Sequence, residues 1–416
     1  MNTFSILFLI AVSVAALTRL WLAFRHVRYV SAHRASVPAA FAADVALDAH
    51  QKAADYTVAK SRFSMAGIIF NAVVLLALTF GGILQGLYDV TGNFLDNELG
   101  RGLLFFALFS LLMTLIDVPF DIYRTFVVEE KFGFNKMTPT LFVKDLFVGL
   151  AVSAVLGLPF LAILLWLMGT AGEHWWLYAW IAGIAFWLFV QFISPTVIAP
   201  LFNKFSPLEN PELKQRIESL LKRCGFQSKG LFVMDGSKRS SHGNAYFTGF
   251  GKSKRIVFFD TLVERHDGPE VEAVLAHELG HFKLHHVLKL TAMFAVLGFV
   301  FFWLLGLAQD TAWLFTGLNV AYPAPDALVL TVFYLALPPF LFFVRPLLAA
   351  YLRKNEFEAD AYAAEYAPAS DLVRALVKLY KDNASTLTPD PLHSAFYDSH
   401  PPAALRIARL EQLSKA

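Results

Sequence analysis

Long runs of apolar residues recur along the chain and are separated by shorter polar segments. A helix needs about 20 mostly apolar residues to cross a hydrocarbon core of about 30 Å. Seven runs meet this requirement, and they lie near 3–24, 65–88, 102–123, 145–169, 175–200, 287–308 and 327–351. The first run lacks a basic beginning and a clear cleavage site, so we expect a retained anchor and not a signal peptide. The pattern predicts an all-α membrane bundle of seven transmembrane helices.

The polar remainder of the chain gathers in two blocks, 201–286 and 352–416. In the first block, 211–226 has the apolar spacing of an amphipathic helix. Three short runs rich in β-formers predict a small β-hairpin or sheet, with 249–255 as a hairpin connection; they are 230–237, 244–250 and 255–262. We therefore divide the chain into 1–200 with five spans, the polar block 201–286, 287–351 with two spans, and a C-terminal helical block 352–416.

Composition agrees with a membrane protein: 56% of the residues are hydrophobic and only 16% are charged. Soluble domains are about 45–50% apolar and about 25% charged. A net charge of +2 and a single cysteine exclude a nucleic-acid binder and a disulfide scaffold, and the hydrophobicity excludes a disordered chain. We expect a monomer whose main partners are the lipid bilayer and a substrate.

Basic residues alternate between the loops and predict the orientation of the bundle. The loops after the first and third spans carry several Lys and Arg, whereas 170–174 and 309–326 carry none. This asymmetry places the C-terminus and the block 201–286 on the cytoplasmic side. Asp117 and Asp121 lie within the third span, where a carboxylate either faces a water-filled interior or caps the helix at the interface.

A predicted helix that begins at Asp267 contains the sequence AHELGHFKLHH. His277 and His281 are four residues apart and share a helix face, about 6 Å apart along the axis. Two imidazoles at this spacing can bind one Zn²⁺, and Glu278 is placed to take a proton from the attacking water. The motif predicts a zinc metalloprotease domain in the polar block.

A catalytic zinc site needs a third protein ligand, and the segment KNEFEADAYA (354–363) offers one. Glu356 and Asp360 share a helix face, whereas Glu358 points elsewhere. We assign Glu356 to the metal and Asp360 to a hydrogen bond on a ligand imidazole; a solvated acidic face is the alternative. His285 lies about 12 Å from His277 along the helix, too far to share one ion. We expect it, like His286, His242 and His393, to be an interfacial histidine and not a ligand.

Several motifs together resemble the type I CAAX prenyl proteases, which are integral membrane zinc metallopeptidases with a seven-helix bundle. The matching segments are EEKFGFNKMTP (129–139), SPTVIAPLFNKFSPL (194–208), SSHGNAYFTGFGKSKRIVFFDTL (240–262), HELGH, NEFEADAYA and SHPPAALRI (399–407). They cover nearly the whole chain in order. The resemblance implies a ring of helices around a water-filled chamber, with one zinc ion inside near the cytoplasmic face.

The resemblance also implies roles for individual residues. The zinc ligands correspond to His277, His281 and Glu356, the general base to Glu278, the aspartate that orients a ligand to Asp360, the residue that holds the substrate backbone to Asn244, and the oxyanion donor to His400 with Arg406 nearby.

The implied substrate is a peptide or protein cleaved near its C-terminus, of the CAAX type and prenylated in the family. A compact chain with alanine-rich loops favours the bacterial inner membrane over the endoplasmic reticulum, and protein prenylation is generally absent from bacteria. Two alternatives therefore stay open. One is a quality-control metalloprotease without a prenyl requirement, and the other is a zinc-binding transporter that uses Asp117 and Asp121.

Overall fold

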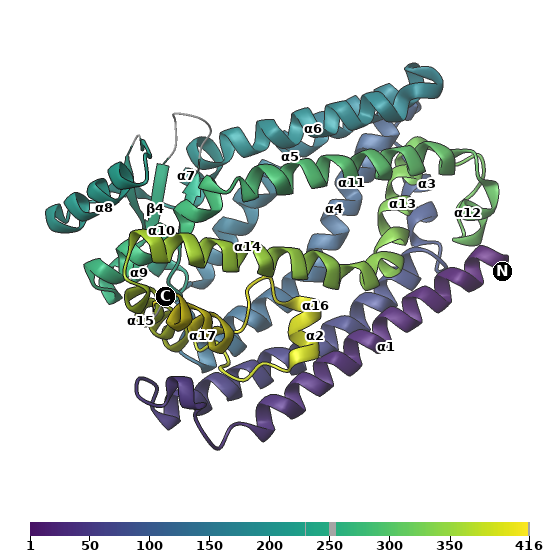
Figure 1. Cartoon of the computed structure of the whole chain (residues 1–416). Helices are drawn as coiled ribbons and strands as arrows, with labels where there is room; N and C mark the ends of the chain where they lie inside the picture. Colours follow the sequence, from purple (N-terminus) through teal and green to yellow (C-terminus); the bar gives the residue numbers. More distant parts are fainter. Residues whose placement is uncertain (229, 249–254, 415–416) are drawn as a thin grey trace.

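Seven helical segments of the structure are long and apolar enough to cross a membrane, as the apolar runs predict. The structure is a computed structural model that describes residues 1–228, 230–248 and 255–414. The long helices run side by side, with a smaller mixed block at one end (Figure 1). They are α1 (Thr3–Ala32), α2 (Leu47–Leu78), α4 (Glu98–Tyr123), α5 (Pro139–Thr170), α6 (Trp175–Ile193), α11 (His286–Gln309), and α13 (Asp326–Leu341) with α14 (Arg345–Tyr366).

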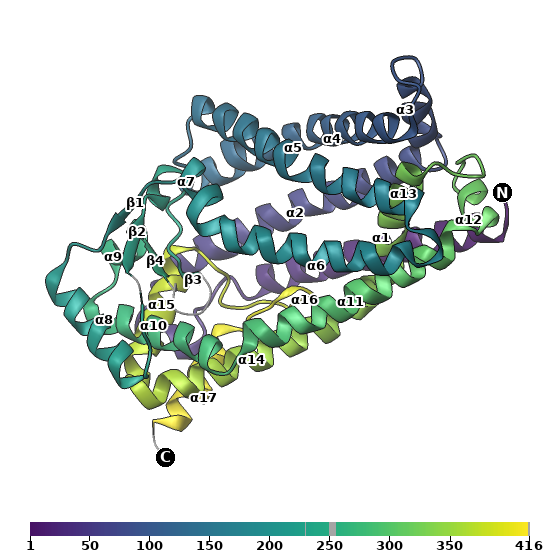
Figure 2. The same cartoon turned by 90° about the horizontal axis from the view of Figure 1, so that it is seen from above.

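Short elements connect the spans or close the two ends of the bundle. At the end beside the N-terminus these are α3 (Ile83–Thr91) and α12 (Ala312–Gly317) (Figure 2). η3 (Gly172–His174) joins α5 to α6 at this same end. The other short elements are η1 (Ala39–Phe41), α7 (Ala199–Phe202), η5 (Gly236–Lys238), α9 (Asp260–Arg265), α15 (Ala369–Asp382), α16 (Pro391–Tyr397) and α17 (Ala403–Leu413).

The second span differs from its predicted range. The apolar run 65–88 predicts one helix, but α2 ends at Leu78 and a separate helix, α3, begins at Ile83. Thr79 is the C-cap of α2, and Gly82, the residue before α3, takes a left-handed conformation with φ of 72°, so the two helices are separated by a turn. At its other end α2 begins at Leu47, so the more polar stretch 47–64, which precedes the apolar run, is also helical.

Proline residues coincide with irregular helix geometry at two places in the spans. Pro195 lies in the π-helical segment η4 (Ser194–Ile198), and Pro338 and Pro339 lie in α13 just before the 3₁₀ segment η6 (Phe342–Val344). Pro200 and Pro346 occupy first-turn positions of α7 and α14, which follow these two irregular segments directly. A second π-helical segment, η2 (Arg124–Glu129), follows α4.

A four-stranded mixed sheet stands at the end of the bundle opposite α3 and α12 (Figure 2). Its strands are β1 (Phe205–Pro207), β2 (Leu231–Met234), β3 (Ala245–Thr248) and β4 (Arg255–Phe259), in the order β1-β2-β4-β3. β2 and β4 pair in parallel, whereas β3 pairs antiparallel with β4 in the register Ala245 to Phe258. The predicted connection falls on 249–254, which lie outside the described residues. β1 has no counterpart among the predicted strands.

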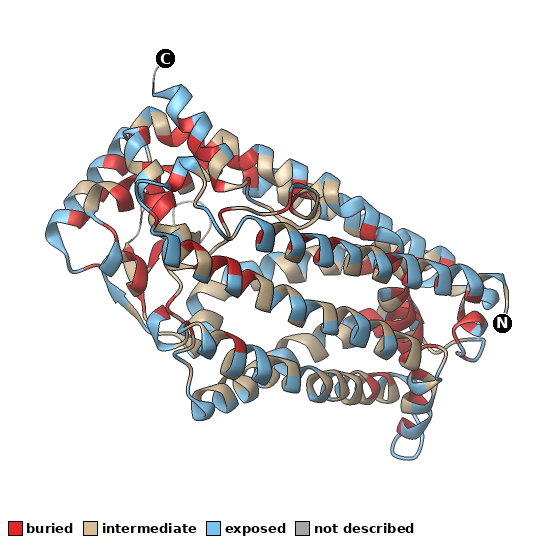
Figure 3. Cartoon of the chain, turned by 90° about the horizontal axis from the view of Figure 1, so that it is seen from below, coloured by how far each residue is buried: buried red, intermediate tan, exposed pale blue. Residues whose placement is uncertain are grey.

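Buried side chains gather at the two ends of the molecule (Figure 3). One core joins α8 (Pro211–Arg223), the sheet, α10 (Gly268–Lys283), α14 and α15; Ile217, Phe258 and Leu275 are fully buried there. The other lies at the N-terminal end around α13 and includes Phe8 and Phe105. The sheet-bearing block therefore has a hydrophobic core of its own.

One arginine of the polar block makes several hydrogen bonds to the membrane bundle. Arg239 donates two hydrogen bonds to Asp145 of α5, 2.7 and 3.0 Å long. It also donates to the carbonyl oxygen of Phe202 and to Asn203 Oδ1, just after the fifth span. Because this ion pair is largely buried, it fixes the position of the block against the ends of the spans.

Candidate metal centre

Helix α10 begins with a capping box. The side chain of Asp267 accepts a hydrogen bond from the amide of Glu270, and Glu270 accepts one from the amide of Asp267. Pro269 occupies the first turn, and Lys378 of α15 donates to the buried Glu270 carboxylate at 2.7 Å. The start of α10 is therefore fixed, which sets the rotation of the helix that carries His277 and His281.

Three side chains converge between α10 and α14, those of His277, His281 and Glu356. His277 Nε2 and His281 Nε2 lie 3.1 Å apart. Glu356 Oε1 lies 3.2 Å from His281 Nε2, and Glu356 Oε2 lies 3.4 Å from His277 Nε2. Within the described ranges, this is the one group of at least three His, Cys, Asp or Glu residues close enough to hold a metal ion.

The three separations are close to those between ligand atoms around tetrahedral zinc, although the two glutamate distances end on different oxygens of the same carboxylate. With bonds of about 2.0–2.1 Å, ligand atoms around tetrahedral zinc are separated by about 3.3–3.4 Å. Two imidazole nitrogens facing each other need a cation or a shared proton between them. The buried Glu356 Oε2 also lacks a hydrogen-bond partner among the described residues. The donor set and its spacing therefore fit a divalent metal.

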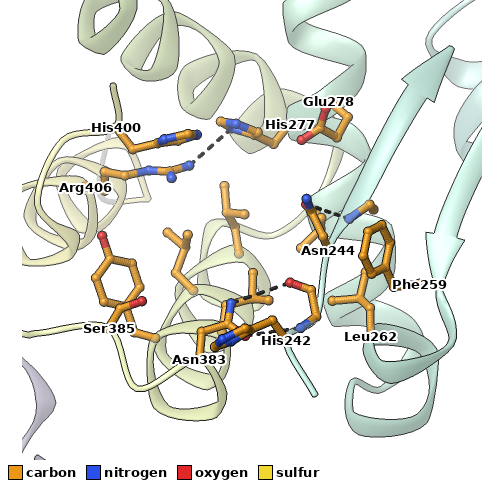
Figure 4. Close-up of a pocket in the computed structure, with 17 residues that line it drawn as sticks. His242, Asn244, Phe259, Leu262, His277, Glu278, Asn383, Ser385, His400 and Arg406 are labelled. Atoms are coloured by element: carbon orange, nitrogen blue, oxygen red, sulfur yellow. Dashed lines mark hydrogen bonds between the residues drawn. The ribbon is translucent and has the colours of Figure 1, made fainter. Parts of the chain in front are cut away.

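The second nitrogen of His277 is held by a buried pair of opposite charges. His277 Nδ1 lies 2.9 Å from Asp360 Oδ1, and Arg406 of α17 donates to both Asp360 oxygens at 2.6 and 2.8 Å. Arg406 Nη2 also lies 3.4 Å from His277 Nδ1, as Figure 4 shows. Burial by itself lowers the pKa of His277, but hydrogen bonds to Asp360 and Glu356 outweigh it and raise the pKa to about 9. Without a metal, the protonated form of His277 is therefore favoured, and a proton competes with a metal for this imidazole.

Glu278 lies beside the three converging residues and faces a cavity of about 490 Å³. In Figure 4, Glu278 lies on one side of His277, while His400 and Arg406 lie on the other. Burial raises the pKa of the Glu278 carboxyl above its ordinary range. A carboxylate in this environment is a stronger proton acceptor than one in water.

His400 and Asn244 line the same cavity from other elements. His400 precedes α17, its Nε2 lies 3.4 Å from Glu356 Oε1, and its side chain is 61% exposed. Asn244 directly precedes β3; its side-chain oxygen accepts the amide of Ala245, and its carbonyl oxygen accepts the amide of Phe259. Every residue that the sequence singles out for the site is thus within this centre or on the cavity wall.

Two residues that no local pattern marks also belong to the surroundings of the centre. His286 is buried and its Nδ1 lies 3.0 Å from His281 Nδ1, so the expectation of an interfacial role is wrong. His242 lines the cavity and approaches Asn383 Oδ1 at 3.2 Å. His285 is exposed and His393 stacks on His26, as structural residues do.

In the third span Asp117 is exposed, and Asp121 pairs with Arg124 at 3.0 Å.

A helical membrane bundle in which two histidines of a HELGH helix converge with a glutamate of another helix defines an integral-membrane metallopeptidase. The chain belongs to peptidase family M48, whose profile matches residues 207–414, and the profile of the CAAX prenyl protease N-terminal region with five membrane helices matches 26–204.

Individual relatives agree over nearly the whole chain. A "CAAX prenyl protease 1 homolog" of Arabidopsis thaliana is 35% identical over 384 residues, which cover 90% of each chain. "CAAX prenyl protease 1" of Saccharomyces cerevisiae is 34% identical over 389 residues, covering 88% of this chain and 86% of the relative. Among solved structures, the crystal structure of S. mikatae Ste24p superposes with a TM-score of 0.94 at 30% identity and covers 99% of this chain and 100% of that chain.

Proposed function

We propose that this metallopeptidase is a zinc-dependent endopeptidase that cleaves CAAX-type peptides near their C-terminus. The single observation that carries the proposal is the triangle of His277, His281 and Glu356, with Glu278 beside it at the cavity wall. Nitrogen and carboxylate ligands with an open fourth position are typical of catalytic zinc. The CAAX specificity is supported by the relatives, which carry that substrate class in their names.

Each polar residue of the centre has a distinct proposed task. Zinc, when bound, supplies a Lewis acid that polarises the scissile carbonyl and makes water acidic. Glu278 accepts the proton of the attacking water and returns it to the leaving amine. His400 donates a hydrogen bond to the developing oxyanion; its exposed side chain beside Glu356 supports this role. Asp360, held by Arg406, keeps His277 in the tautomer that presents Nε2.

The substrate backbone is proposed to pair with β3. This strand is at the edge of the sheet, and Asn244 and Ala245 at its beginning line the cavity. An extended peptide that adds to this edge has its backbone held by main-chain hydrogen bonds, independent of its side chains. Asn244 is then placed to contact the backbone of the same peptide.

A cleavage assay with one peptide, with and without a farnesyl group on its cysteine, tests the substrate class. The proposal expects the farnesylated peptide to be cleaved with higher kcat/KM by the purified, zinc-loaded protein. Equal rates would leave a general membrane metallopeptidase of the quality-control type. No cleavage of either peptide, with zinc bound, would contradict the endopeptidase assignment.

The transporter alternative loses support from the third span. Asp121 is paired with Arg124, and Asp117 does not belong to the metal group. Zinc flux in sealed vesicles that persists in a Glu278→Gln variant would revive that alternative.

Five further expectations remain predictions. They are the cytoplasmic orientation, the bacterial inner membrane, the monomeric state, the four-part division of the chain and the water-filled chamber. Orientation is measured by labelling a cysteine placed at the exposed Glu218 of α8, with Cys224→Ser removing the native thiol. A membrane-impermeant maleimide should label it in inside-out vesicles and not in right-side-out ones.

A further inference from the structure

His286 connects one proposed metal ligand to a surface carboxylate. Its side chain is 4% exposed. On one side, its Nδ1 lies 3.0 Å from His281 Nδ1. On the other, its Nε2 lies 3.0 Å from Glu358 Oε2. The three side chains form a continuous hydrogen-bonded chain that ends at the metal-facing nitrogen of His281.

The direction of every hydrogen bond in this chain follows from the position of the ligand atom. His281 Nε2 faces Glu356 and His277 Nε2, so it must present its lone pair to the metal. The proton of a neutral His281 is therefore on Nδ1, and it is donated to His286. His286 accepts at Nδ1, which places its own proton on Nε2, and there it donates to the Glu358 carboxylate. In this arrangement each of the two imidazole N–H groups is donated to an acceptor within the three side chains.

The backbone brings these residues together at the junction of α10 and α11. After α10 ends, His285 takes a left-handed conformation with φ of 57°, and α11 begins at His286. This turn folds His286 back onto His281. Glu358 is two residues after Glu356 on α14, so it faces away from the metal and toward His286.

We propose that His286 and Glu358 are positioning residues that fix the tautomer and ring orientation of His281 for metal binding. This inference rests on the proposed zinc site. With this role, both proposed histidine ligands have the nitrogen that faces away from the metal held by a partner: His286 holds Nδ1 of His281, and Asp360 holds Nδ1 of His277. A ligand imidazole whose second nitrogen is held in this manner binds metal more strongly, and loss of the partner typically weakens binding about 10–100-fold.

The test is a competition between the purified full-length protein and a zinc chelator, with zinc affinity as the readout. His286→Leu removes the acceptor, and we expect about 10–100-fold weaker zinc binding. His286→Asn places an amide oxygen near the position of Nδ1, and we expect it to restore most of the affinity. His285→Asn is the matched control, because it removes the adjacent exposed histidine and asparagine tolerates the left-handed conformation. It should bind zinc as the wild type does.

A second variant keeps the test decisive if His286→Leu does not fold. Glu358 is 36% exposed, so Glu358→Ala is compatible with folding, and we expect about tenfold weaker zinc binding. Glu365→Ala, an exposed acidic position on the same helix, is its control. In the Co²⁺-substituted protein, His286→Leu should shift the visible absorption bands, whereas His286→Asn and His285→Asn should not.

Two outcomes separate this inference from the proposed function. Wild-type protein that fails to bind zinc would overturn the proposed function itself. Wild-type protein that binds zinc, together with unchanged affinity in a folded His286→Leu or Glu358→Ala variant, would overturn the positioning role alone.

Discussion

Gly280 of α10 lies against the backbone of Ala359 of α14. A methyl group on Gly280 would come within 3.0 Å of Ala359 Cα and 3.1 Å of its carbonyl oxygen. Gly280 directly precedes the ligand His281, and Ala359 is one turn beyond Glu356. Glu356, the third proposed ligand, reaches the two histidines because these helices meet backbone to backbone.

Gly280→Ala should therefore separate the helices and weaken metal binding. Overpacking of this kind costs about 1–3 kcal/mol of stability. We expect a lower unfolding midpoint of the metal-free protein and reduced zinc content. Gly157→Ala in α5 is the matched control, because the space around that glycine is open; it should leave both quantities unchanged. Equal behaviour of the two variants would contradict the close contact.

Glu278→Gln should abolish catalysis without removing the metal. The amide cannot accept the proton of the attacking water, so kcat should fall by about 10²–10⁴. Because Glu278 is not among the three converging residues, zinc content by elemental analysis should stay at the wild-type level. Cleavage that persists in the zinc-loaded variant would contradict the assignment of the base.

The pH profile should report the burial of Glu278. Burial raises the pKa of this carboxyl, so the ionised, proton-accepting form is lost as the pH falls through a value above the ordinary range of about 4.3. The acid limb of kcat/KM should lie at that raised pKa. Zinc content measured at each pH separates this effect from metal loss. An acid limb at the ordinary glutamate value would show that another group controls it.

Removing Arg406 should destabilise the protein more than removing any nearby surface arginine. Its guanidinium is buried with Asp360 and lies 3.5 Å from Glu356. Arg406→Leu leaves buried carboxylate charge without its partner, which costs about 3–5 kcal/mol. The exposed Arg409 on the same helix provides the control, Arg409→Leu. Both are compared by equilibrium unfolding of the metal-free protein in mild detergent; equal midpoints would contradict the prediction.

His400→Ala should lower kcat and leave zinc affinity unchanged. The loss of one oxyanion donor costs about 10²–10³ in kcat. Because the side chain is exposed to the cavity, the substitution leaves no buried cavity behind. Weaker zinc binding with unchanged kcat would instead make His400 a metal-site residue.

The bundle and the metal set could be predicted because their signals are local or repeated. Apolar runs define the spans, and the spacing of His277 and His281 places two ligands on one helix face. β1 is missed because three residues that include a proline carry no alternation. The contact of His286 with Glu358 joins positions far apart in the sequence and depends on the turn at His285, so no periodicity reports it.

The order of the elements along the chain also bears on how the enzyme is made. α10 carries two of the proposed ligands, but α11 and α13 must both be inserted before α14 can present Glu356. Arg406 and His400 are translated later still. A nascent chain whose HELGH helix has been translated thus holds an incomplete centre, and it cannot be an active protease until synthesis has passed both spans.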